Sequence, residues 1–213
     1  MIWKRKPRPK NASKKVALCN RLGIRSGTNL QGVDLKGVNL KGANLKKDLD
    51  LRRADLRVAN LEGVNLEGAN LTNANLEGAN LNWANLANAN LEFADLSVAD
   101  LFEANLTNAD LRRSDLRVAN LTGANLTGAD LRKAKLLEAC WRNANLTGAN
   151  LTNADLRRAN LTNANLTNAN LEGANLRGAS LKNANLEGAN LEFAELSNTC
   201  LTGATMPDGK IHD

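Results

Sequence analysis

The sequence predicts an all-β fold, an elongated parallel β-helix built from stacked four-sided coils. Leucine recurs at every fifth position over most of the 213 residues, and a small residue, usually alanine, stands two positions before it. Aromatic residues make up only 3% of the chain, whereas hydrophobic residues make up 43%. So few large side chains cannot fill a wide core, and so many apolar residues argue against disorder. A narrow core of small and medium side chains satisfies both conditions.

The repeat unit has five residues, and 36 copies occupy residues 28–208. Leucine fills 34 of the 36 central positions, and Trp141 and Met206 fill the other two. A period of five matches neither a helix nor a flat strand, so the chain must turn once in each unit. If one unit forms one side of a coil, the leucine and the residue two before it face inward, and the other three face water. Coils stacked ~4.8 Å apart then give about nine coils and a rod ~40 Å long.

Units such as Ala59-Asn60-Leu61-Glu62-Gly63 carry the motif A-(D/N)-L-X-X, and through it the chain resembles the pentapeptide-repeat family. The resemblance extends over about 85% of the chain. It implies a right-handed quadrilateral β-helix, the fold of a pentapeptide-repeat solenoid, and a family that is abundant in cyanobacteria. Some members of this family resemble duplex DNA in shape and charge and bind DNA gyrase.

The first 27 residues lie outside the repeat and carry nine Lys and Arg residues and no acid. We expect residues 1–12 to form a basic flexible arm, because Pro7 and Pro9 exclude a regular helix. Anionic membranes and nucleic acids would bind its basic side chains and its aromatic residue; a solubilising tail is the alternative. The candidate arm contacts are Trp3, Lys4, Arg5, Lys6, Arg8 and Lys10.

Residues 13–27 are interpreted as a short capping helix and a lead-in to the first coil. Ser13 can cap a helix over residues 14–22, and Gly23 can end it. The repeat ends at residue 208, and residues 209–213 form a C-terminal tail.

Two irregularities interrupt the repeat. One extra residue lies between Leu45 and Leu51, where Leu49 stands at an alanine position, and a local bulge is the simplest explanation. Trp141 is larger than the leucine position it fills. Either the coil widens around an inward indole, which we favour, or the indole points outward as a contact site.

With four units per coil, every twentieth residue returns to the same side of the rod. Arginine gathers on two adjacent sides, where Asp-Leu-Arg triplets place a carboxylate beside each arginine. Such paired charges are interpreted as a solubilising surface. Residues 28–213 hold 19 basic and 22 acidic side chains, so the excess that makes the whole chain +6 lies in the first 27 residues.

Two aromatic residues, Trp83 and Phe102, fall on one side in adjacent coils. They are the leading candidate contact on the rod, together with Trp141 if its ring points outward.

Catalysis requires convergent acid, base, nucleophile or metal ligands. The one histidine, His212, lies in the tail, and Cys19, Cys140 and Cys200 lack the spacing of a metal site and are interpreted as free thiols. We therefore expect no enzyme activity, no cofactor, no metal and no small-molecule substrate.

The function that the sequence favours is a rigid binding or scaffold module for a protein partner of unknown identity. The alternatives are a DNA-mimicking gyrase-binding protein, for which the repeat is too weakly acidic, and an adaptor that uses the basic arm. Because an open β-helix end invites pairing, a weak end-to-end homodimer is also expected. The start of the chain lacks a signal peptide and no stretch resembles a membrane span, which predicts a cytoplasmic protein.

Overall fold

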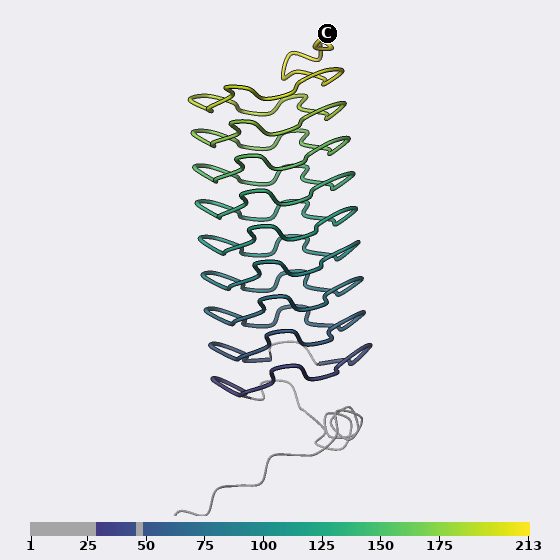
Figure 1. Cartoon of the computed structure of the whole chain (residues 1–213), viewed down its shortest axis with the longest axis vertical. Coiled ribbons are helices and arrows are strands. Elements are labelled where there is room, and N and C mark those ends of the chain that lie inside the picture. Colours follow the sequence, from purple (N-terminus) through teal and green to yellow (C-terminus); the bar gives the residue numbers. More distant parts are fainter. Residues whose placement is uncertain (1–28, 46–48) are drawn as a thin grey trace, which may run out of the picture.

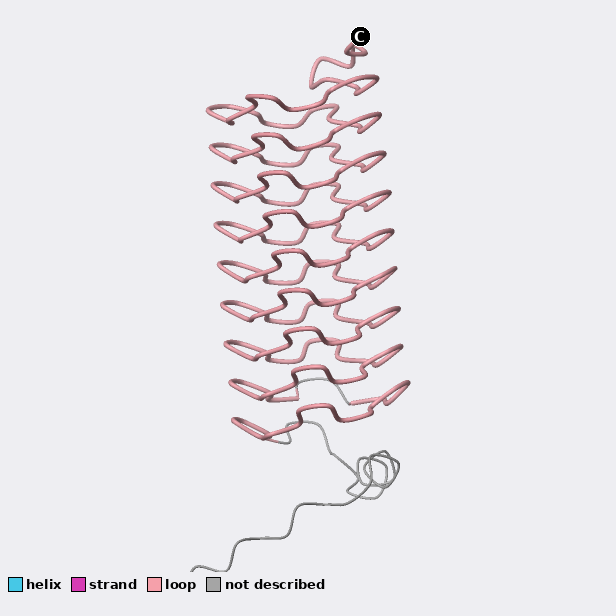
Figure 2. Cartoon of the chain, viewed as in Figure 1, coloured by secondary structure: helices cyan, strands magenta, loops and turns pink. Residues whose placement is uncertain are grey.

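Parallel backbone bridges with a constant spacing join each coil to the next. The computed structural model describes residues 29–45 and 49–213, and within them no helix and no strand longer than a single bridge occurs. The residue before each leucine bridges the residue 20 positions later, as in Asn70↔Asn90 and Asp110↔Asp130. Four units of five residues therefore complete one coil, and Figure 1 shows these coils stacked in sequence order. Figure 2 accordingly draws the rod as loops and turns.

A tight turn follows each inward leucine. The carbonyl of Leu71, for example, accepts the backbone N–H of Ala74 at 2.9 Å, and Asn73 between them has a φ of 58°. A positive φ at the third residue of a four-residue turn is the feature of type II turns, which favour glycine or asparagine at that place. The pentad thus bends the chain once per unit, as its period predicts.

The Asn or Asp before each leucine fastens the same turn. The side-chain oxygen of Asn70 accepts the backbone N–H of Thr72 at 3.1 Å, which is an Asx turn. The backbone of Asn70 is bonded twice to the preceding coil, since its N–H donates to the carbonyl of Leu49 and its carbonyl accepts the N–H of Leu51. A polar residue that closes a turn and a ladder position that joins neighbouring coils therefore coincide in most units; Lys135 and Cys140 are exceptions.

The core is a set of leucine and alanine columns. Leu111, Leu131 and Leu151 are fully buried, and the residues before them bridge one another in order, so the predicted stacking on one side is confirmed. The adjacent Arg132 is exposed, as expected, whereas Arg112 is half-buried. Burying a leucine contributes about 2 kcal/mol, and ordering one backbone residue costs about 1–2 kcal/mol, so a coil needs its neighbours to be stable.

Trp141 points into the core and is fully buried. Its Nε1 has no hydrogen-bond partner among the described residues. The inward indole that we favoured is therefore correct. Trp141 is therefore not a surface contact, and the alternative in which its ring points outward is wrong, because none of the residue is exposed.

The inserted residue changes the register once. Bridges that begin before it have a spacing of 21, as in Asn44↔Asn65, and bridges that begin after it have a spacing of 20, as in Asp50↔Asn70. Leu49 is fully buried in the alanine column. The predicted bulge itself and the predicted arm and capping helix lie outside the described residues.

The C-terminal residues fold back as a small cap. Thr205 and Ile211 form an antiparallel bridge, and the N–H of Gly203 donates to the carbonyl of His212 at 2.7 Å. Ala204 beneath this cap is buried, but Leu191 and Leu196 on the other sides of the last coil stay half-buried. The described part of the chain has no helix that is long and apolar enough to cross a membrane.

Candidate contact surfaces

Large apolar side chains are exposed mainly in one stretch of the rod. Seven such side chains are exposed among the described residues, and five of them lie between positions 58 and 118. All five are β-branched or aromatic residues at the third position of a turn, where the side chain does not cover the core. The five are Val58, Trp83, Phe93, Val98 and Val118, and the other two are Phe193 and Ile211.

Three valines of this group form a column with unusual backbone. Val58, Val98 and Val118 have φ values of 54°, 57° and 59°, and they are 66%, 61% and 54% exposed. Their numbers differ by multiples of 20, so they share one corner of the rod, with Gly78 between the first two. A β-branched residue in the left-handed region is a true outlier that costs of order 1 kcal/mol or more. Because these valines are exposed, burial of their side chains offsets little of that cost. The stability of the fold therefore does not explain why valine stands at these positions.

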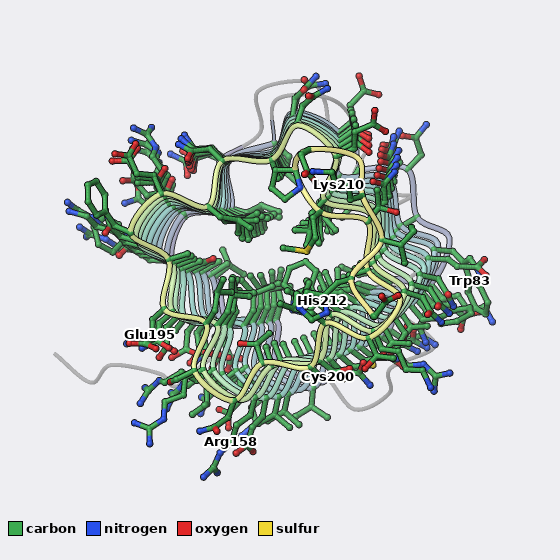
Figure 3. All side chains as sticks on the ribbon, turned by 90° about the horizontal axis from the view of Figure 1, so that it is seen from above. Trp83, Arg158, Glu195, Cys200, Lys210 and His212 are labelled. Carbon is green, nitrogen blue, oxygen red and sulfur yellow. The ribbon has the colours of Figure 1, made fainter. Side chains whose placement is uncertain are left out.

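An aromatic pair occupies the next corner. The rings of Trp83 and Phe102 meet edge to face, with centroids 5.8 Å apart and planes at 87°. Trp83 is 53% exposed, and its Nε1 donates to Oε2 of Glu103 at 3.0 Å. Figure 3, which looks down the rod, shows Trp83 pointing away from the stack at one corner. The sequence placed Trp83 and Phe102 in adjacent coils, and the two rings are in contact.

Two carboxylates lie beside this aromatic pair. Asp100 accepts the side-chain amides of Asn82 and Asn120, each at 2.9 Å, and Glu103 accepts the indole N–H. Neither carboxylate has a Lys or Arg nitrogen within 4.0 Å in residues 29–45 and 49–213. The corner therefore combines an exposed indole with negative charge that no described cation neutralises.

The arginine-bearing sides have a different character, because most of their charges are paired. In each Asp-Leu-Arg triplet the guanidinium bonds the aspartate two residues earlier, as Arg57 does to Asp55 at 2.6 Å. That hydrogen bond lowers the pKa of Asp55 to about 2. The expected pairing is thus present in the triplets. The other pairs are Arg52 with Asp50, Arg112 with Asp110, Arg117 with Asp115, Arg132 with Asp130 and Arg157 with Asp155.

The same pairing limits what the arginine groove can bind. Arg157, Arg158 and Arg177 border an open groove of about 580 Å³. Arg157 is paired with Asp155, and Arg158 lies 3.2 Å from Glu138. Of the three, only Arg177 forms no ion pair within the described residues, so little net positive charge is left there for an anion.

The cysteines give no sign of a shared site. Cys140 and Cys200 are free thiols, and Cys19 lies outside the described residues. Hydrogen bonds with the backbone and side chain of Thr202 lower the pKa of the exposed Cys200 thiol. In the described stretch of the chain, no group of three or more His, Cys, Asp or Glu side chains could hold a metal ion.

A solenoid of stacked five-residue turns with a polar, variable surface is the class of protein that this geometry defines. The family described as pentapeptide repeats matches the sequence in eight copies, between residues 26 and 206. The chain belongs to the pentapeptide-repeat family, and this membership, with the four-sided coils, gives it a right-handed quadrilateral β-helix. The matched family is not a family of enzymes.

One solved structure is similar over nearly the whole length. It is HetL, a pentapeptide-repeat protein involved in heterocyst differentiation regulation in the cyanobacterium Nostoc sp. strain PCC 7120. The two chains are 33% identical, with a TM-score of 0.59, and the match covers 92% of this chain and 98% of HetL.

Two further solved structures contain the same repeat, but their backbones superpose less well on this chain. Rfr23, from the cyanobacterium Cyanothece 51142, is 42% identical over 46% of this chain and 64% of its own, with a TM-score of 0.41. QnrB1, a plasmid-mediated fluoroquinolone resistance protein, is 20% identical over 79% of this chain and 91% of its own, with a TM-score of 0.42. No curated protein matches the sequence.

Proposed function

We propose that this protein is a non-catalytic, rigid binding or scaffold module that acts on a protein partner in the cytoplasm. The observation that carries the proposal is the column of Val58, Val98 and Val118. These exposed side chains stand on left-handed backbone that strains them, at positions that glycine or asparagine would fill without strain. A partner that buries the valines would gain the free energy of removing their apolar surface from water.

Charge favours this role over DNA mimicry. A protein that replaces duplex DNA must reproduce the dense negative charge of the phosphate backbone. Residues 28–213 carry only three more acidic than basic side chains. Most arginines that face the solvent in Asp-Leu-Arg triplets are neutralised in place, so the rod presents no continuous field of either sign.

Affinity capture with a matched variant tests the proposal. The bait is the full-length protein, and the comparison bait has Val58, Val98 and Val118 replaced by Asn, which suits a positive φ and leaves the core untouched. We expect a partner that the full-length protein retains and the triple variant releases. Identical retention by both baits, with the triple variant at least as stable as the parent protein, would overturn the role of the valine column.

We also propose that the last coil supports a weak end-to-end homodimer. The backbone N–H groups of Leu191, Phe193 and Leu196 donate to no backbone carbonyl in the described residues, and the two leucines are half-buried. Unpaired ladder groups beside apolar side chains are suited to pairing with a second coil. Light scattering should show a mass that rises with concentration and that falls when the half-buried Leu196 is replaced by Lys, which places a charge on the apolar part of the open end. A monomer mass at every concentration would exclude the dimer.

A further inference from the structure

The acidic aromatic corner at Trp83 has room for a ligand on one side only. Toward the C-terminal end, Trp83 meets Phe102 and Glu103. Toward the N-terminal end, the same turn position holds Gly63 in the next coil and Gly42 in the one before it. A Cβ built on either glycine would meet nothing within 4 Å. The third turn position is therefore free of side chains from the first described coil up to the edge of the indole, and the neighbouring Lys41 and Glu62 form an ion pair with each other at 2.8 Å beside it.

The chemistry of this corner selects a cationic side chain. An ammonium or guanidinium group lying against an exposed indole gains a cation–π interaction. Glu103 uses Oε2 for the indole N–H, and its Oε1 has no hydrogen bond in the described residues. Asp100 is held in place by two amides and adds a second negative charge. A peptide with adjacent basic residues and an apolar residue fits these groups.

The N-terminal segment of this chain has that composition. Residues 1–12 contain five Lys and Arg residues, no acid, and the apolar side chains of Ile2 and Trp3. The described chain begins at Asn29, in the coil that also contains Gly42. The 19 residues between positions 10 and 29 span up to ~60 Å when extended, whereas the coil of Trp83 lies roughly 10–15 Å farther along the rod.

We propose that the basic segment Trp3–Lys10 binds in cis to the corner formed by Trp83, Phe102, Asp100 and Glu103. It runs along the bare positions of Gly42 and Gly63, and one of its Lys or Arg side chains lies on the indole of Trp83 and pairs with Glu103. Tethering raises the local concentration of the segment to the millimolar range, so a weak contact is sufficient to keep it bound. The corner is in this way an interaction surface for basic peptides, and its first ligand is the chain itself.

The exposed Trp83 and the buried Trp141 allow a direct test. The indole N–H signals of Trp83 and Trp141 are compared by NMR in full-length protein and in protein lacking residues 1–12. We expect the Trp83 signal to differ between them and the buried Trp141 signal to stay the same. Adding a synthetic peptide of residues 1–12 to the shortened protein should move the Trp83 signal toward its full-length position. This movement should vanish in 0.5 M salt, because exposed charge pairs are screened.

Matched variants locate the contact. The affinity of the labelled peptide for the shortened protein is measured by anisotropy, and Glu103→Gln should weaken it about threefold to fivefold, as expected for one exposed ion pair. Trp83→Asn should weaken it at least as much, and asparagine suits the φ of 57° at that position. Phe93→Asn changes an aromatic residue at the same place of a turn on another side of the rod, where φ is 58°, and should leave the affinity unchanged.

Three results would overturn the proposal. One is an identical Trp83 signal with and without residues 1–12. Another is equal peptide affinity for Glu103→Gln, Trp83→Asn and the parent protein. The third is a Trp83 signal in the full-length protein that returns, on dilution, to its position in the shortened protein while the measured mass falls from dimer to monomer. That result would mean that the segment binds to a second copy of the chain.

Discussion

Residues 58–118 and residues 143–190 share one core and differ in what their turns carry. Leucine and alanine columns are buried equally in both regions. At the third turn position, where φ is positive, the later region has Gly or Asn everywhere except Arg158. In the earlier region seven of the thirteen such positions hold other residues, three of them valine. Inward positions therefore determine the coil, and the outward turn positions are free to differ between regions.

A charge in the shared core should have the largest effect. Leu131 is fully buried between Leu111 and Leu151, and an aspartate there would have no partner for its charge. We expect Leu131→Asp to lower the stability by more than about 4 kcal/mol and to unfold both regions together. Thermal unfolding followed by circular dichroism measures it, with Leu131→Met as the volume-conserving control. An unchanged melting temperature, or loss of one region alone, would contradict a common core.

Exchanging turn residues between the regions should have smaller, opposite effects. Val98→Asn relieves a strained valine in the earlier region and should stabilise the protein by about 1 kcal/mol. Asn153→Val places a valine at the equivalent position of the later region, where φ is 57°, and should destabilise by about the same amount. Denaturant unfolding measures both. Equal signs for the two changes would mean that strain at this position is not what distinguishes the regions.

Much of this fold was predictable from the sequence because one period governs it. The spacing of leucine located the inward columns, and the Asp-Leu-Arg triplets located the paired charges. The same spacing brought Trp83 and Phe102 together. Sorting by twenties would also have aligned Val58, Val98 and Val118, but their significance depends on the left-handed turn residue, which the period alone does not reveal.

Other features have no periodic signal. The indole N–H of Trp83 reaches Glu103, a neighbour at a spacing of 20, and only side-chain geometry shows that this bond forms. The return of residues 203–212 over the last coil depends on a reversal at Gly209 rather than on the repeat. The period therefore predicts contacts that recur in every coil, and it does not predict contacts that occur only once.

The smallest expected effect concerns acid, and it should be alike in both regions because both contain Asp-Leu-Arg pairs. In the turn directly before the earlier region, the guanidinium of Arg57 lowers the pKa of Asp55 to about 2, and in the later region Arg157 likewise lowers the pKa of Asp155. An aspartate in the unfolded chain titrates near about 3.9. Since the folded pKa is the lower one, each pair stabilises the protein above about pH 4, and this contribution is lost as the pH falls toward about 2. Both pairs are partly exposed to solvent, which screens them, so each effect is small. Asp55→Asn and Asp155→Asn keep an oxygen that accepts the turn N–H but remove the titrating group. Melting temperatures from pH 5 to pH 2 should therefore fall less steeply in each variant than in the parent protein, and by similar amounts. Parallel curves for all three proteins would show that the pairs add nothing to stability.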